Sequence, residues 1–240
     1  MKCDLHVHST FSDGENTPEE MVLSAISLGL DTIGFSDHSY MERNIGYCMT
    51  DEDGYKAEIS RLKEKYRAKI NILCGVEQDY FAARPAEGYD YIIGSVHNIF
   101  VGDESFEVDS SAETTLAACA KYFGGDIYAL AEEYYRLVAD VKRKTGADII
   151  GHFDLLTKFN EKTPLFDESN PRYTAAWKSA ADSLLKYGVP FEINYGAITR
   201  GYRTTPYPSP KIREYIISRG GRLIQSSDSH RADTIGYGFI

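Results

Sequence analysis

Short apolar runs alternate along the chain with longer stretches in which apolar residues recur at helical spacing. This alternation predicts an α/β fold with a mostly parallel sheet, either open or closed into a barrel. Each apolar run has the length of a buried strand, and polar residues, glycine or proline flank it. The predicted strands cover residues 3–7, 32–36, 70–76, 91–96, 148–151, 190–194 and 222–226.

The ends of the intervening helices are also visible in the sequence. Residues 17–20, "TPEE", have the pattern of a capping box with proline at the first helical position, and Gly29 ends this helix. Ser209 is expected to be an N-cap rather than a ligand, because a proline follows it and Gly220 ends the segment. The other helical spacings run through residues 55–66, 127–138 and 170–188.

Polar side chains gather where the predicted strands end, beginning with the stretch "DLHVHSTFSDG" after the first strand. All six histidines of the chain occupy such positions. The C-terminal strand ends of an α/β barrel converge on one face, whereas an open sheet spreads them along an edge. The distribution therefore favours a barrel. The residues at these strand ends are His6, His8, Asp37, His38, Glu77, His97, His152, Asp228 and His230.

The spacing of these residues indicates a metal site. Side chains at positions i and i+2 of a strand point to the same side, so His6 and His8 face the barrel mouth together. Asp228 and His230 repeat this arrangement on the last strand. Imidazole and carboxylate ligands suit Zn, Mn or Fe. The set exceeds the needs of one catalytic ion, which predicts a cluster in which Glu77 bridges two ions.

Composition and charge restrict the partners of the protein. A chain of 240 residues that is 42% hydrophobic fits one sizeable domain. The formal net charge of −10 argues against long nucleic acid or an anionic membrane surface, but bound divalent ions would still admit a small phosphorylated substrate. The apolar runs are shorter than the ~18 residues of a membrane span. Four cysteines without C-x-x-C spacing are interpreted as reduced thiols, and a cytoplasmic location is expected.

Several motifs together resemble a known family. The strings "DLHVHSTFSDG", "GFSDHS", "GVEQDY", "DYIIGSVHN", "GHFDL", "EINYG" and "SSDSH" are similar to those of the PHP (polymerase and histidinol phosphatase) superfamily, and the likeness extends to about Gly238. Within it, "DYIIGSVH", "GHFDLLTKF" and the "R…YPSP" segment resemble the monofunctional histidinol phosphatases. The resemblance implies a distorted (β/α)7 barrel, formed by residues 1–240 as one domain, with its active site at the C-terminal ends of the strands.

The same resemblance implies three divalent metal ions and distributes their ligands. Asp13 by itself has the pattern of an ordinary turn residue, and only the motif makes it a ligand. Some relatives carry histidine at this position, so aspartate bears on the metal preference. By motif, the first ion takes His6, His8, Glu77 and Asp228, the second takes Asp13, His38 and His230, and the third takes Glu77, His97 and His152.

The implied reaction is hydrolysis of a phosphomonoester by a metal-activated water, with L-histidinol phosphate as the expected substrate. Asp228, His230 and Arg200 are the expected catalytic residues. The segment "YGAITRGYRTTPYPSP" offers Arg200 and Arg203 as phosphate-binding residues, since guanidinium matches phosphate oxygens bidentately. Asp37 is expected to orient its neighbour His38.

Residues 98–126 form the least regular part of the sequence. Asp103, Glu104 and Glu107 follow the fourth predicted strand, where they either meet the ammonium group of a cationic substrate or form a solvated acidic loop. Relatives usually continue past "GYGF" into a final helix, whereas this sequence stops at Ile240, so closure of the barrel is expected to lack that support.

Three alternatives to a histidinol phosphatase stay open. The first is a PHP phosphoesterase that acts on small nucleotides or oligonucleotides. The second is an amidohydrolase, whose barrel also opens with H-x-H but commonly uses a carbamylated lysine where this chain has Glu77 and His97. The third is a non-catalytic PHP module, which would be expected to lose ligands, whereas all nine positions are filled here.

Overall fold

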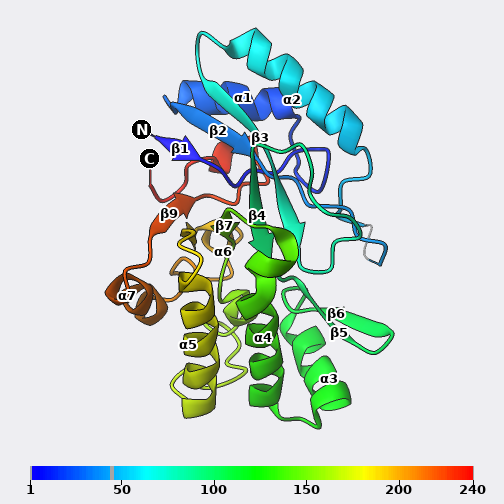
Figure 1. Cartoon of the computed structure of the whole chain (residues 1–240), viewed down its shortest axis with the longest axis vertical. Coiled ribbons are helices and arrows are strands. Elements are labelled where there is room, and N and C mark those ends of the chain that lie inside the picture. The colour runs from blue at the N-terminus through cyan, green and yellow to red at the C-terminus, as the bar shows by residue number, and fades with distance from the viewer. Residues whose placement is uncertain (1, 44–45, 240) are drawn as a thin grey trace.

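A seven-stranded parallel sheet forms the centre of the computed structural model, which describes residues 2–43 and 46–239 (Figure 1). The two ends of the predicted domain, residues 1 and 240, lie outside the described residues. The strand order is β1-β2-β3-β4-β7-β8-β9, and every predicted strand is confirmed. The strands are β1 (Cys3–Asp4), β2 (Thr32–Phe35), β3 (Asn71–Asp79), β4 (Tyr91–Ser95), β7 (Ile149–Ile150), β8 (Phe191–Asn194) and β9 (Leu223–Ser226).

Direct pairing between the first and last strand segments nearly closes this sheet into a barrel. Val7 and Ser229 form a parallel bridge, in which the N–H of His8 donates to Ser229 O at 2.8 Å and the N–H of Ser229 donates to His6 O at 3.1 Å. Next to this seam, the buried carboxylate of Asp4 accepts hydrogen bonds from the residues that follow β9. The predicted α/β barrel is confirmed, and its closure brings the two histidine-containing ends together.

Helices cover the outside of the barrel in two groups. In Figure 1, α1 and α2 lie at one end, and α3, α4 and α5 lie at the other. One apolar core lies beneath α1 and α2, and a larger one, which contains Trp177, lies between α4, α5 and the neighbouring strands. The helices are α1 (Pro18–Ser27), α2 (Glu52–Tyr66), α3 (Ala112–Phe123), α4 (Ile127–Thr145), α5 (Pro171–Leu185), the short α6 (Gly196–Thr199) and α7 (Pro210–Ser218).

The helix starts follow the sequence pattern with one variation. Thr17 and Glu20 form the predicted capping box, and the side chain of Asn170 caps α5. Ser209 occupies the N-cap position of α7, but its backbone N–H donates to Asp154 Oδ2 at 2.9 Å, and its hydroxyl has no capping partner among the described residues. Ser209 therefore joins the start of α7 to the loop after β7.

Residues 98–126 are regular, so the expectation of an irregular segment was wrong. They form an antiparallel hairpin of β5 (Asn98–Val101) and β6 (Glu104–Glu107), followed by α3. Gly102 adopts a φ of +62° at the hairpin tip, a conformation that glycine tolerates. Ile99 and Phe106 pair across the hairpin and are buried in the larger core, which explains why so short a hairpin is ordered.

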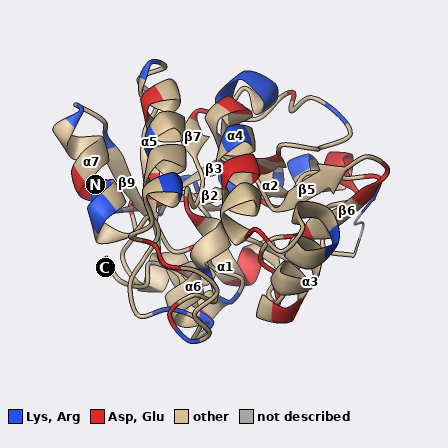
Figure 2. Cartoon of the chain, turned by 90° about the horizontal axis from the view of Figure 1, so that it is seen from below, with Lys and Arg blue, Asp and Glu red and all other residues tan. Residues whose placement is uncertain are grey.

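Acidic and basic residues are interleaved on the outer helices (Figure 2). On α4, Arg136 pairs with Glu133 and Arg143 pairs with Asp140, each three residues apart. On α4, each of these two arginines is therefore paired with a carboxylate of its own helix. Among the described residues, no helix has the length and apolar character needed to cross a membrane.

Candidate metal centre

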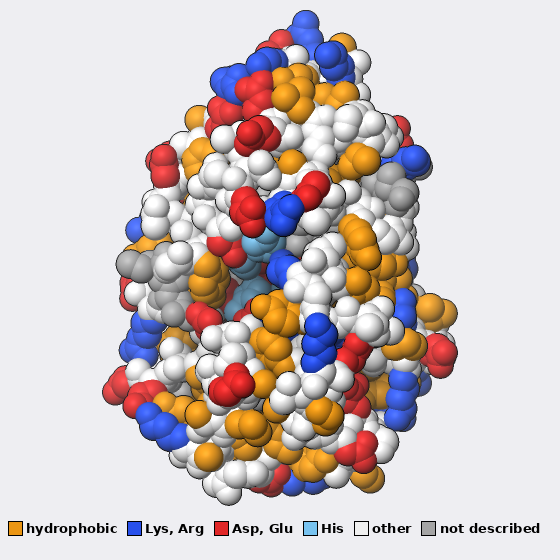
Figure 3. Space-filling view, turned by 180° about the vertical axis from the view of Figure 1, so that it is seen from behind, with side chains coloured by type: hydrophobic (Ala, Val, Ile, Leu, Met, Phe, Trp, Pro, Cys, Tyr) orange, Lys and Arg blue, Asp and Glu red, His pale blue; other side chains and the backbone are white. Residues whose placement is uncertain are grey.

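The C-terminal ends of the strands surround a cavity of about 400 Å³. Seen from behind, the molecule is hollowed at this place and pale blue histidine side chains are visible inside (Figure 3). The cavity wall contains seven of the nine predicted ligands, while His6 and His8 are completely buried beside them. The same wall also contains Glu107, Asp109, Lys158 and Arg200.

The first predicted ligand set is assembled at the seam of the barrel. His6 Nε2 lies 3.3 Å from Glu77 Oε2, and His8 Nε2 lies 3.6 Å from the same oxygen. Asp228 Oδ1 lies 3.5 Å from His8 Nε2 and 3.9 Å from His6 Nε2. These four atoms, from three separate strand ends, therefore lie close together at the seam.

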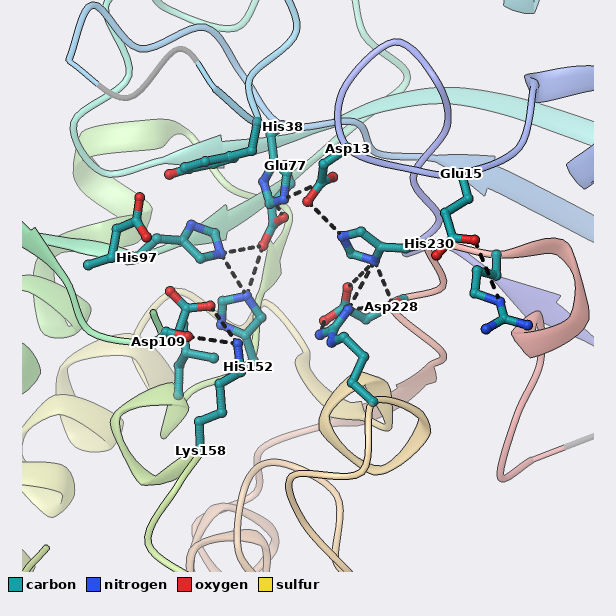
Figure 4. Close-up of a pocket in the computed structure, with 15 residues that line it drawn as sticks. Asp13, Glu15, His38, Glu77, His97, Asp109, His152, Lys158, Asp228 and His230 are labelled. Atoms are coloured by element: carbon teal, nitrogen blue, oxygen red, sulfur yellow. Dashed lines mark hydrogen bonds and ion pairs between the residues drawn. The ribbon is translucent and has the colours of Figure 1, made fainter. Parts of the chain in front are cut away.

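The second predicted set lies on the other side of His8. Asp13 Oδ1 lies 3.6 Å from His38 Nε2, and Asp13 Oδ2 lies 3.2 Å from His230 Nε2 (Figure 4). His8 Nδ1 also approaches Asp13 Oδ1, at 3.8 Å. The turn residue Asp13, which only the family motif made a ligand, therefore lies among the histidines.

The third predicted set surrounds the other oxygen of Glu77. His152 Nε2 lies 2.9 Å and His97 Nε2 lies 3.4 Å from Glu77 Oε1, and the two Nε2 atoms are 3.2 Å apart. His38 Nδ1 contacts Glu77 Oε2 at 2.9 Å, so His38 lies between the second set and the Glu77 oxygen that faces the first set. The two oxygens of Glu77 face different groups of imidazoles, which is the geometry that a bridging carboxylate needs.

The buried nitrogen atoms of His6 and His8 test whether a metal fits. His6 Nε2 and both ring nitrogens of His8 have no hydrogen-bond partner within the described part of the chain. Burial, together with His230 and His38, lowers the pKa of His8 to about 3, so its imidazole is neutral at physiological pH. Metal ions bind the neutral form of imidazole, so His8 already has the protonation state that a metal requires. The residues present therefore fit divalent metal ions.

Two carboxylates outside the ligand set hold the imidazoles in place. His6 Nδ1 donates to Glu192 Oε1 at 2.7 Å, and His97 Nδ1 donates to Asp79 Oδ2 at 3.1 Å. Such bonds leave Nε2 of each ring free to bind a metal. Sequence reasoning missed both partners. For Asp79 the signal was present, because the i, i+2 rule that pairs His6 with His8 also places Asp79 on the same side of β3 as Glu77.

The turn that carries Asp13 is held by Asp37. This buried carboxylate accepts hydrogen bonds from the N–H of Ser9 at 2.8 Å and from the hydroxyl of Ser12 at 2.6 Å. Gly14 closes the turn, because a Cβ there would lie 2.6 Å from the backbone nitrogen of Ser9. Asp37 thus acts on the second ligand set through the loop of Asp13, rather than through a hydrogen bond to His38 as expected.

Arg200 lies at the cavity wall beside the seam. Its Nη2 donates to Asp228 Oδ2 at 3.1 Å, and its Nη1 lies 3.0 Å from His230 Nδ1. Burial alone would raise the pKa of Asp228, but Arg200 and His6 outweigh it and hold that pKa well below its usual range. Asp228 has a φ of +52°, an uncommon value for a non-glycine residue.

Arg203 lies away from the cavity, so the structure does not bring it to the other predicted site residues. Its exposed fraction is 5%, and its guanidinium stacks on Tyr207 at 4.6 Å. Each of its three nitrogens donates within the protein, to Thr157 Oγ1 and to the carbonyl and hydroxyl oxygens of Thr205. This placement does not support the expected phosphate contact.

Only one of the three acidic residues expected to meet a cationic substrate reaches the cavity. Asp103 is exposed at the hairpin tip, and Glu104 pairs with Lys121 on α3, so both fit the alternative of a solvated acidic segment. Glu107 does line the cavity, next to Asp109, which sequence reasoning missed. Asp109 in turn binds Lys158 Nζ at 3.1 Å (Figure 4). The hairpin therefore ends in an acidic wall, formed by Glu107 and Asp109, beside the third ligand set.

The chain is similar to known proteins both in sequence and in structure. The family model described as the PHP domain matches residues 4–196. The protein named probable histidinol-phosphatase of Deinococcus radiodurans is 28% identical over 253 residues, which cover 99% of this chain and 89% of that relative. The crystal structure of a Listeria monocytogenes protein superposes with a TM-score of 0.82 at 22% identity, covering 99% of this chain and 98% of the other.

A second solved structure contains ligands. It is histidinol phosphate phosphatase from Lactococcus lactis in complex with zinc, L-histidinol and phosphate. It matches with a TM-score of 0.65 at 23% identity, and the match covers 96% of this chain and 87% of that one. At these identities the two structural likenesses show that the chain shares the fold of these proteins.

Proposed function

Because this chain belongs to the PHP family, we propose that it is a metal-dependent phosphomonoesterase that hydrolyses L-histidinol phosphate to L-histidinol and phosphate. The observation that carries the proposal is the position of Glu77, whose two oxygens face separate imidazole groups in a cavity that also contains Arg200. The Deinococcus relative and the Lactococcus complex with zinc, L-histidinol and phosphate support the choice of substrate.

The proposed cofactors are three divalent ions, which can be Zn, Mn or Fe. When bound, such ions acidify a water molecule and neutralise phosphate oxygens. Three groups of potential ligand atoms support this number, and the atoms within each group lie within 4.8 Å of one another. The groups are His6, His8 and Asp228; His8, Asp13, His38 and His230; and His38, Glu77 and His97. The ligands would be His6, His8, Glu77 and Asp228 for the first ion, Asp13, His38 and His230 for the second, and Glu77, His97 and His152 for the third.

Arg200 is the proposed phosphate-binding residue of the chain. One-third of its side chain is exposed, so its guanidinium can donate to a phosphate oxygen in the cavity while it keeps its contact with Asp228. Asp228 holds the guanidinium from behind through Oδ2 and its backbone oxygen, which fixes the direction of the remaining N–H groups. In this proposal Asp228 acts both as a ligand and as the support of Arg200, whereas His230 acts as a ligand through Nε2 while its Nδ1 donates to Asp228 O at 3.2 Å.

The acidic wall of Glu107 and Asp109 is the proposed place for the ammonium group of the substrate. It lies next to the third ligand set, and both carboxylates line the same cavity as Arg200. Lys158 neutralises part of Asp109, whereas Glu107 has no such partner among the described residues. A substrate with a phosphate at one end and a cation at the other would match this distribution of charge.

We further propose a cytoplasmic location for the protein. Cys3, Cys74 and Cys119 carry free thiols, as is usual where thiols are kept reduced. Burial raises the pKa of the Cys3 and Cys74 thiols to about 11, so they are poorly reactive.

The test is a comparison of substrates with the metal-loaded protein. The protein would be purified with Mn or Zn, its metal content measured, and phosphate release followed from L-histidinol phosphate beside a panel of nucleotides and sugar phosphates. We expect a kcat/KM for histidinol phosphate at least about a hundredfold above the panel, or about 2.7 kcal/mol of transition-state preference. Similar rates throughout, or preference for a nucleotide, would contradict the proposed substrate.

A further inference from the structure

The two loops that carry Lys158 and Arg200 of the cavity wall are joined to each other away from the ligands. The loop after β7, residues 152–161, contains His152 and Lys158, and the loop after β8, residues 195–209, contains Arg200. Lys158 and Arg200 both line the cavity. Because neither residue lies in a long helix or a strand, their positions depend on how the two loops pack together.

Arg203 is the principal link between these loops. From the second loop, its Nη1 donates to the hydroxyl of Thr157 in the first loop, one residue before Lys158. Its Nε donates to Thr205 O at 3.2 Å, and its Nη2 donates to Thr205 Oγ1 at 3.3 Å. The planar guanidinium thus donates hydrogen bonds to both loops at once, which the single ammonium group of a lysine cannot reproduce.

Further contacts strengthen the same junction. Glu161 accepts hydrogen bonds from the N–H of Thr204 at 2.7 Å and from the hydroxyl of Thr205 at 3.0 Å. The Arg203 guanidinium stacks on Tyr207, whose ring contacts His152 edge-on with the centroids 6.3 Å apart. The junction therefore reaches a predicted metal ligand as well as the two cations.

We propose that Arg203 is a positioning residue of the phosphatase, which fixes the loop of Arg200 onto the loop of His152 and Lys158. This inference rests on the proposed function, but it assigns Arg203 a role different from the phosphate contact expected from the sequence. Its guanidinium is buried and its three nitrogens have partners in the protein, so it acts on the substrate through Arg200 and Lys158.

The test compares Arg203→Lys, Arg203→Met, Thr157→Val and the double variant Arg203→Lys/Thr157→Val. Arg219→Lys serves as the matched control, because Arg219 is exposed at the end of α7 and pairs with Asp182. The measurements are kcat and KM for L-histidinol phosphate, Ki for inorganic phosphate, and hydrogen exchange of residues 155–161 and 196–209.

We expect Ki for phosphate to rise about tenfold or more in Arg203→Lys and by a similar factor in Arg203→Met, because a small displacement of a positioned group is costly. Thr157→Val should have a smaller effect in the same direction, and the double variant should be no worse than Arg203→Lys. Hydrogen exchange should increase in both loops together and stay unchanged in Arg219→Lys.

Three results would overturn the inference. Near-normal Ki in Arg203→Lys beside a large loss in Arg203→Met would mean that the positive charge itself acts on phosphate. Additive effects of the Arg203 and Thr157 substitutions, or unchanged exchange in either loop, would exclude the junction. If Arg203→Met does not fold, Arg203→Lys and Thr157→Val decide the matter. If the unaltered protein released no phosphate, the proposed function would fail, while hydrogen exchange would still test the junction.

Discussion

His6 Nδ1 lies 2.7 Å from Glu192 Oε1, a contact between two buried side chains that are 186 residues apart. Because Nδ1 donates this hydrogen bond, Nε2 of the ring is left facing Glu77 and Asp228. The other oxygen of Glu192 accepts from the backbone N–H of His152 at 3.0 Å. One carboxylate on β8 therefore orients residues of two predicted ligand sets.

Glu192→Gln should reduce metal affinity by about 10- to 100-fold, the usual cost of removing such a partner. The amide keeps the size of the side chain but removes the charge that fixes the tautomer of His6. Competition between the protein and a chelator measures the loss. Glu214→Gln, on the exposed side of α7, is the control. Equal affinity of both variants would show that Glu192 has no influence on the metal site.

Arg200→Met should lower kcat/KM for L-histidinol phosphate by about a hundredfold, because the chain loses its proposed charge-assisted hydrogen bond to phosphate. Steady-state kinetics at saturating metal provides the measurement. Arg219→Met tests whether loss of any arginine has the same effect. If Arg200→Met had the same kinetics as the unaltered protein, Arg200 would not bind the phosphate group.

Glu107→Gln should raise KM for L-histidinol phosphate and leave KM for a phosphomonoester without a cationic group unchanged, since only the first substrate carries an ammonium group. Glu104→Gln is the matched control, because Glu104 lies in the same hairpin but pairs with Lys121 outside the cavity. A rise of equal size for both substrates would contradict an ammonium site at the acidic wall.

The same carboxylate predicts how KM depends on pH. Burial, followed by the nearby Asp109, raises the pKa of Glu107 above its ordinary value of 4.5. The ammonium site exists only when Glu107 is ionised, so KM should increase as the pH falls through this raised pKa. In Glu107→Gln, KM should no longer rise as the pH falls through this range. An identical rise in both proteins would mean that another group causes it.

Removal of metal should abolish phosphate release and lower the melting temperature. An ion at a hundred times its Kd stabilises the folded state by about 2.7 kcal/mol, which for a chain of this length corresponds to about 5–10 °C. Differential scanning calorimetry of chelated and reloaded protein gives the shift. If the protein still releases phosphate after all of its metal ions have been removed, the reaction does not depend on metal.

The barrel could be predicted because its signals are local. Strand length, helical spacing and the capping box at Thr17 each depend on a few neighbouring residues, and the structure confirms all of them. The hairpin after β4 was missed because its order comes from burial of Ile99 and Phe106 against helices further along the chain. A short amphipathic segment has no comparable local signal.

Six histidines and their carboxylate partners could be assigned to the strand ends of a parallel barrel before the fold was known, because the period of a strand and its C-terminal end can be located within a few residues. Which distant groups support these ligands depends on contacts between segments that are far apart in the sequence. Glu192 reaches His6 across the fold, and Arg203 packs into the loop junction although Arg200, three residues earlier, faces the cavity. The direction of a loop side chain depends on the packing of the loop, which has no periodicity from which it could be predicted.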